Sequence, residues 1–184
     1  MKKALILIDI QKDYFEGGRK MLVGADEAVG NAKSVLEKCR KENIDIIHVQ
    51  HINYREGATF FLPDTEGIEI HPYVAPLPDE KVITKDFPNS FRETELLSYL
   101  QERGINALII CGMMTHMCID TTVRAARDLG FMNLLIGDAC ATLDLQIEDK
   151  FVKAADVHYA FLAALNRNFC QVVNSNDYIN DNIE

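Results

Sequence analysis

The chain has 184 residues, of which 48% are hydrophobic, and a formal net charge of −9 at pH 7. This length predicts one domain, residues 1–184, that is large enough to bury a core of its own. The acidic charge leaves no basic stripe to neutralise phosphates, so it argues against nucleic acid as a partner. The five cysteines are odd in number and widely scattered, which is typical of reduced thiols in the cytoplasm rather than of a disulfide framework.

The chain begins with a uniformly apolar run at residues 4–8 that stops at Asp9. The run is too short for a signal-peptide core, and no later run is long enough to cross a bilayer. We therefore expect a cytoplasmic protein with no membrane partner. Short runs that are apolar throughout are typical of strands buried on both faces, so residues 4–8 predict a central parallel strand with Asp9 at its carboxyl end.

A helix is predicted over residues 25–43, where apolar side chains recur at helical spacing and Lys and Glu occupy the far side. A second strand is expected at residues 44–50. The segment that follows, residues 51–78, contains several prolines and aromatic residues. A connection of this length in a compact domain is more often a binding loop or a lid than an unstructured link.

The second half of the chain continues the alternation. A short third strand at residues 81–84 delivers Lys85, and a helix over residues 94–103 follows it. The fourth strand, residues 107–111, ends at a glycine turn, beyond which Cys118 lies where the next helix begins. A thiol at a helix N-terminus lies near unpaired N–H groups and the positive end of the helix dipole, which lower its pKa.

The last elements are a fifth strand at residues 133–136, a long helix at residues 147–166 and a sixth strand at residues 171–173. Asp138, just after the fifth strand, is interpreted as either a turn residue or a cap. Strands that alternate with helices predict a three-layer α/β/α fold with a six-stranded, mainly parallel sheet and right-handed crossovers.

In such sheets, ligands bind outside the carboxyl ends of the strands. Asp9, Lys85 and Cys118 are all expected at that edge, although each alone is as readily a cap, a solvated lysine or a small buried residue. Together they suit nucleophilic catalysis, because a thiol that attacks a carbonyl needs a base and its leaving group needs an acid. Asp9 could serve as both in turn. A positive charge on Lys85 offsets the effect of the carboxylate on the thiol, so one proton can pass between Asp9 and Cys118.

With these three positions aligned, the sequence resembles the isochorismatase-like cysteine hydrolases over nearly its whole length. The resemblance rests on the segments ALILIDIQKDYF, VITKDFPNSF, CGMMTHMCIDTTVRAARDLG and DACAT, of which the third is the most specific. It implies an isochorismatase-like fold of Rossmann-like topology, with Asp9, Lys85 and Cys118 as the catalytic residues. It also implies a cis peptide bond between Met113 and Met114, which would aim the N–H groups of Met114 and Cys118 at one point as an oxyanion hole.

The resemblance further implies acyl transfer without a cofactor. Asp9 takes the proton of Cys118, the thiolate attacks a small amide, imide or ureide, and water hydrolyses the thioester that results. The members that give the family its name cleave a vinyl ether without a cysteine nucleophile, so Cys118 favours amide chemistry. The family often forms dimers or tetramers, so a homo-oligomer is expected, although the apolar side of residues 147–166 suits an intrachain core equally well.

Nicotinamidases of this family bind a metal through an Asp-x-His pair and a second histidine after the second strand. The comparable residues here are Val49, Gln50 and His51, so the aspartate is missing. His48 and His51 do not replace it, because residues three apart in a strand point to opposite faces. We therefore expect no metal.

The walls of the substrate pocket are the part of the site that the sequence determines least. Phe15, Phe60, Phe61 and Phe87 are candidates for substrate contact, and a plain core position is as plausible for each of them. His116, two residues before Cys118, occupies a position where nicotinamidases commonly carry Asp, and it is a further substrate-binding candidate. The histidines expected to be structural are His48, His71 and His158.

Two functions stay open on this scaffold: a cysteine-dependent amidohydrolase, and a non-catalytic thiol-bearing binding or redox protein. Nucleotide binding is disfavoured because no Gly-x-Gly-x-x-Gly follows the first strand. Phosphoryl transfer through Asp9 is disfavoured as well, since Gln11 stands where that chemistry usually needs a second acid.

Overall fold

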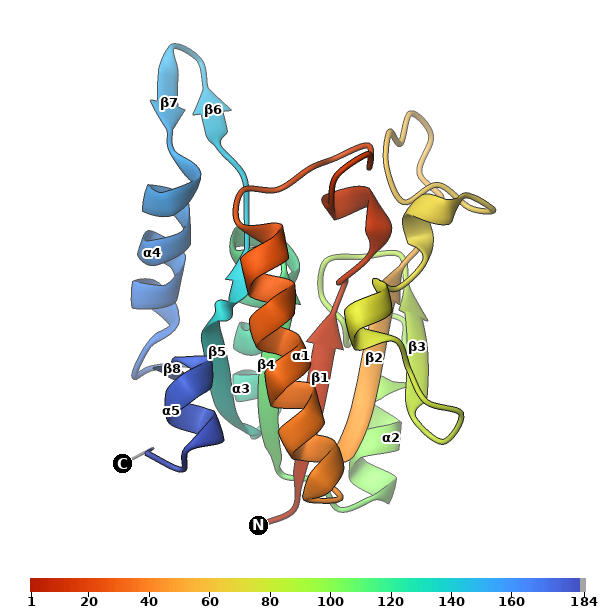
Figure 1. The fold of residues 1–184 in the computed structure, drawn as a ribbon, viewed down its shortest axis with the longest axis vertical. Helices are drawn as coiled ribbons and strands as arrows, with labels where there is room; N and C mark the ends of the chain where they lie inside the picture. Colours follow the sequence, from red (N-terminus) through yellow and green to blue (C-terminus); the bar gives the residue numbers. More distant parts are fainter. Residues whose placement is uncertain (183–184) are drawn as a thin grey trace.

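Six parallel strands form the central sheet of the computed structural model, which describes residues 1–182. They lie in the order β3-β2-β1-β4-β5-β8 (Figure 1). Their bounds, in that order, are Lys81–Lys85, Asp45–His51, Lys3–Ile8, Ala107–Met113, Met132–Ala141 and Gln171–Val173. Each neighbouring pair runs parallel, which confirms the predicted six-stranded sheet.

Helices cover both faces of this sheet, as the predicted three-layer arrangement requires (Figure 1). One face carries α1 (Ala25–Lys41) and the short C-terminal α5 (Ser175–Ile179). The other carries α2 (Leu96–Glu102), α3 (Asp120–Asp128) and α4 (Ala154–Leu165). None of the helices between residues 1 and 182 is long and apolar enough to cross a membrane.

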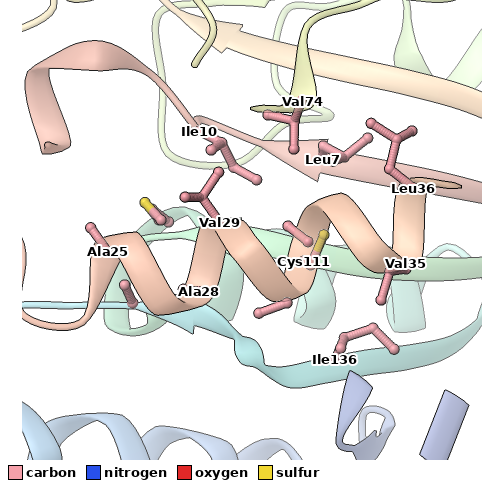
Figure 2. Packing of buried hydrophobic residues seen from close by; sticks show 14 of the residues in the cluster. Leu7, Ile10, Ala25, Ala28, Val29, Val35, Leu36, Val74, Cys111 and Ile136 are labelled. Atoms are coloured by element: carbon pink, nitrogen blue, oxygen red, sulfur yellow. The ribbon is translucent and has the colours of Figure 1, made fainter. Parts of the chain in front are cut away.

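The core beneath α1 shows why the sequence selects this arrangement. The apolar stripe of α1 faces Leu7 of β1, Cys111 of β4 and Ile136 of β5, with Val29 and Val35 among the helix residues that pack on them (Figure 2). A second core lies on the opposite face of the sheet. Because both faces are covered, the central strands are apolar throughout instead of alternating with polar residues.

The prediction of one long helix over residues 147–166 is wrong in its first third. An antiparallel hairpin of β6 (Leu145–Ile147) and β7 (Lys150–Val152) occupies that stretch, and α4 begins only at Ala154. The apolar Ile147 and Phe151 are four residues apart, a spacing that imitates a helical stripe. Extended backbone at the N-cap of α4 ends the hairpin, and Asp144 accepts a hydrogen bond from the N–H of Ala154.

The other differences concern the ends of elements. The fifth strand continues to Ala141, and the polar tail folds into α5. Asp138 therefore lies inside β5, where its carboxylate accepts hydrogen bonds at 2.7 Å from both N–H and Oγ of Ser175, the first residue of α5. Of the two interpretations of Asp138, a cap at the start of a helix fits this geometry.

The long connection between β2 and β3 is built from two short helical turns, η2 (Glu66–Ile68) and η3 (Pro72–Val74). A third turn, η1 (Lys12–Tyr14), follows β1 and packs beside η2. Gln11 Nε2 donates to the carbonyl of Ile68 at 2.9 Å, and Gln50 Nε2 donates to the same carbonyl at 2.7 Å. The connection is thereby held against the carboxyl ends of both β1 and β2.

Candidate active site

The strand order places a topological switch point between β1 and β4, because the chain leaves β1 towards β2 and β3 before it crosses to β4. Crevices for ligands form at such points, at the carboxyl ends of the strands. Asp9 directly follows β1, and Cys118 lies in η4 (Thr115–Ile119), the single π-helical turn after β4. Lys85 is the last residue of β3, the edge strand two positions away from β1.

The side chains of Asp9, Lys85 and Cys118 meet at this point, as the sequence predicts. Lys85 Nζ lies 2.8 Å from Asp9 Oδ2 and 3.3 Å from Cys118 Sγ. It also donates to the carbonyl of Phe87 at 3.1 Å and to Nδ1 of His51 at 3.1 Å. All three residues of this cluster are buried, with at most 4% of their surface exposed.

Burial and charge together set the protonation of the cluster. Burial raises the pKa of the Cys118 thiol and the Asp9 carboxylate raises it further, so the thiol keeps its proton although Lys85 acts in the opposite direction. Burial alone would raise the pKa of Asp9, but Lys85, with His51 and Cys118, lowers it below its ordinary value. The pKa of Lys85 is raised, since Asp9 and Cys118 outweigh its burial. The resting cluster is a carboxylate, an ammonium and a thiol.

The backbone around Cys118 is held close to the end of β1. Gly112 has a φ of 132°, and a Cβ there would lie 2.0 Å from the carbonyl oxygen of Ile8, so only glycine allows this approach. The Met113–Met114 peptide bond is cis. The carbonyl of Met114 accepts from the N–H groups on both sides of Cys118, and the N–H of Met114 has no acceptor among residues 1–182.

The aromatic candidates divide into two groups. Phe61 is fully buried, and its ring centroid lies 5.7 Å from that of His51 and 5.0 Å from that of Phe60. Phe87 contributes its carbonyl to Lys85, while its ring lies 3.6 Å from the guanidinium of Arg92. These three aromatic residues are therefore near the cluster.

The other two candidates for substrate contact, Phe15 and His116, make contacts with residues outside the cluster. Phe15 packs against His71 with ring centroids 4.2 Å apart. Nδ1 of His116 lies 2.6 Å from Oγ1 of Thr142, at the end of β5. Contact of either residue with a substrate stays a prediction.

His51 is the residue at the cluster to which the sequence assigned no role. It is the last residue of β2, one beyond the expected end of that strand, and it pairs in register with Lys85. Gln11 fixes it from both sides, because its amide nitrogen donates to the His51 carbonyl and its amide oxygen accepts from the His51 N–H, each at 2.8 Å. The usable signal was the pairing of two parallel strand ends, which places residue 51 beside residue 85.

The potential metal ligands at the site do not fit a bound metal. Donor atoms of Asp9, His51 and Cys118 lie within 4.8 Å of one another. Lys85 Nζ, however, contacts one atom of each, so an ammonium group already occupies the position that a metal cation would need. His48 is turned away and lies 2.9 Å from a carboxylate oxygen of Glu80.

Comparison with known proteins identifies the family of the chain. Residues 3–177 match the family model of the isochorismatase domain. The chain belongs to the isochorismatase family. The isochorismatase family protein YddQ of Bacillus subtilis is 52% identical over 166 residues, which are 90% of this chain and 92% of that protein. The fold of a protein of Oleispira antarctica assigned to the isochorismatase hydrolases matches with a TM-score of 0.94 at 42% identity, covering 97% of this chain and 96% of that one.

A relative with a named activity is the streptothricin hydrolase of Streptomyces noursei. It is 32% identical over 143 residues, which are 78% of this chain and 56% of that enzyme. The predicted family and the predicted class, a hydrolase on an isochorismatase-like fold, are thus confirmed.

Proposed function

We propose that this chain is a cysteine-dependent hydrolase of a carbon–nitrogen bond in a small amide, imide or ureide, acting through a thioester acyl-enzyme. One observation carries the proposal: a single buried ammonium, that of Lys85, lies within hydrogen-bond distance of both Asp9 and Cys118. A thiol, a carboxylate and an ammonium arranged in this way supply a nucleophile, a proton carrier and a fixed positive charge.

The reaction begins when Asp9 takes the proton of Cys118 and the thiolate attacks the substrate carbonyl. The N–H groups of Met114 and Cys118 hold the oxyanion, and loss of one such donor typically costs about 100- to 1000-fold in rate. Asp9 then protonates the departing nitrogen. Water attacks the thioester with Asp9 as its base, which frees the thiol and releases the acid. Lys85 stays charged throughout and keeps the cluster from carrying a net negative charge.

The burial of the cluster supports a small substrate. The segment of residues 52–78 covers the ends of β1 and β2, where the N–H of Phe61 donates to the buried carboxylate of Asp13 at 2.6 Å. We therefore assign this segment as a lid that opens to admit substrate and closes to exclude water.

Replacing Cys118 tests the proposal. Cys118→Ser removes the reactive sulfur with little change in volume, and Cys140→Ser makes the same change at another buried cysteine outside the cluster. The wild-type protein and Cys140→Ser should release ammonia from members of a panel of small amides and ureides, and mass spectrometry should show an acyl group on Cys118. Equal activity in Cys118→Ser would refute the mechanism. A wild-type protein that forms no acyl adduct would favour the non-catalytic thiol-bearing alternative.

Two further expectations belong to this proposal. The five cysteines are free, which suits the reducing cytoplasm. The hairpin of β6 and β7 projects beyond α4 (Figure 1), and an isolated two-stranded hairpin is only marginally stable in water. Two large apolar or aromatic side chains on this face are exposed to solvent, Ile147 on the hairpin (72%) and Tyr159 on α4 (71%). We propose that a second copy of the chain covers this face in a dimer or tetramer. A monomeric mass by analytical ultracentrifugation at micromolar concentration would contradict it.

A further inference from the structure

Tyr14 is buried beside the cluster with an unused polar group. It ends η1, five residues after Asp9, and only 1% of its surface is exposed. Its ring packs edge-on against Phe61 at 4.6 Å and near Phe60 at 6.0 Å. Its hydroxyl makes no hydrogen bond with any of residues 1–182. Phenylalanine would fill the same space, so packing alone does not require the hydroxyl group of Tyr14.

Tyr14 lies beside the reactive groups. Phe61 touches both Tyr14 and His51, which in turn accepts a hydrogen bond from Lys85. The pKa of Tyr14 is raised well above its ordinary value, first by burial and then by the charges of Cys118 and Asp9. The phenol therefore stays protonated at neutral pH and is available as a hydrogen-bond donor.

The carboxylate of Asp9 also has an oxygen atom without a hydrogen-bond partner. Oδ1 of Asp9 is buried and has no hydrogen-bond partner among residues 1–182, while Oδ2 is held by Lys85. The residues around the cluster therefore offer one unpaired acceptor, on Asp9, and one unpaired donor, on Tyr14. A ligand that satisfied both would present an N–H and, on another atom, an oxygen. A buried carboxylate oxygen without a partner, such as Oδ1 of Asp9, is normally completed by a hydrogen-bond donor, here one on a bound molecule.

We propose that Tyr14 is a specificity-determining residue whose hydroxyl donates a hydrogen bond to a second carbonyl oxygen of the substrate. The first carbonyl oxygen is already assigned to the N–H groups of Met114 and Cys118, so Tyr14 serves a different oxygen. The substrate class is thereby narrowed to imides, ureides and diamides, in which a second carbonyl lies two bonds from the reacting carbon. This inference rests on the proposed hydrolysis at Cys118.

The test compares two primary amides of matched length in wild type and Tyr14→Phe. Malonamide carries the second carbonyl and butyramide does not, and both release ammonia from the same kind of group. The ratio of their kcat/KM values cancels effects that are common to both substrates. We expect wild type to prefer malonamide and Tyr14→Phe to lose about 10-fold of that preference, the scale of one neutral hydrogen bond. Tyr178→Phe, which removes another buried hydroxyl, should leave the ratio unchanged.

The possible results distinguish failure of the role assigned to Tyr14 from failure of the proposed hydrolysis. An unchanged ratio in Tyr14→Phe, or equal losses on both amides, overturns the role of Tyr14 and leaves the proposed hydrolysis intact. If wild type releases ammonia from neither amide, nor from biuret, and forms no adduct on Cys118, the proposed function fails and this inference fails with it. Thermal unfolding of Tyr14→Phe should match wild type, since the ring contacts with Phe60 and Phe61 are retained.

Discussion

Replacing Lys85 with methionine removes the ammonium from the cluster while an unbranched side chain stays in its place. At the observed 2.8 Å between Lys85 Nζ and Asp9 Oδ2, and at an effective dielectric of about 20, the lost attraction is roughly 6 kcal/mol. Asp9 then keeps its buried position without a counter-charge, which raises its pKa well above the ordinary value. Asp9 becomes protonated near neutral pH and no longer takes the proton of Cys118.

The sign of the pH dependence follows from this reasoning. In the wild type the pKa of Asp9 is lowered, so its contribution to stability is present at neutral pH and is lost as the pH falls through the folded-state pKa. In Lys85→Met the pKa of Asp9 in the folded protein is raised. The folded state therefore loses stability as the pH rises from the pKa that Asp9 has in the unfolded chain towards neutrality. Breaking a buried pair by removing one partner typically costs about 3–5 kcal/mol, and this cost should be largest at neutral pH.

Urea unfolding at pH 4 and pH 7, together with ammonia release, measures these effects. We expect the loss in free energy of unfolding, measured for Lys85→Met relative to wild type, to be larger at pH 7 than at pH 4. We also expect its kcat/KM at pH 7 to fall by at least about 1000-fold. The double variant Asp9→Asn, Lys85→Met removes both charges, so it should regain stability at pH 7 but not activity. The reasoning is refuted if Lys85→Met keeps a tenth of the wild-type activity, or if its stability follows the same pH profile as wild type.

Two further predictions concern residues outside the cluster. Burial would raise the pKa of Glu80, but hydrogen bonds from Arg40, from the backbone and from His48 lower it to about 2. Glu80→Gln should therefore cost roughly 2–3 kcal/mol at pH 7, and urea unfolding should show this difference vanish as the pH falls from 5 to 2. Asp13→Asn weakens the hydrogen bond to the N–H of Phe61, so hydrogen exchange at that amide should speed up by about 10-fold or more while exchange in β1 is unchanged.

The residues of the cluster were predictable because each follows a predicted strand, although the strand before Lys85 has only two apolar residues, Val82 and Ile83. The apolar run before Asp9, the short segment before Lys85 and the apolar run before the glycine turn that leads to Cys118 predict three parallel strands. Parallel strands place their carboxyl ends on one edge. The chemistry of an acid, an amine and a thiol then selected these three residues from the many polar ones in the loops.

Prediction from sequence is weaker where the local pattern and the tertiary contacts disagree. Ile147 and Phe151 imitate a helical stripe but belong to a hairpin, because the backbone stays extended up to the N-cap of α4. His51 was placed one residue beyond the second strand, so its pairing with Lys85 was not foreseen. Tyr14 was not among the candidates predicted from the sequence, since nothing in the sequence shows that its hydroxyl lacks a partner.

The strand order also explains why the positive charge is a lysine. Neighbouring strands lie about 4.8 Å apart, so β3 is roughly 10 Å from β1 across β2. Lys85 spans that interval with its long unbranched side chain and passes His51, the residue that ends β2. A shorter cation on β3 would stop at β2, and arginine would bring a broader head into a space that already holds four acceptors. Because the edge strand supplies the charge, the acid and the thiol can follow the adjacent central strands β1 and β4, which brings their side-chain atoms within 4.8 Å of one another.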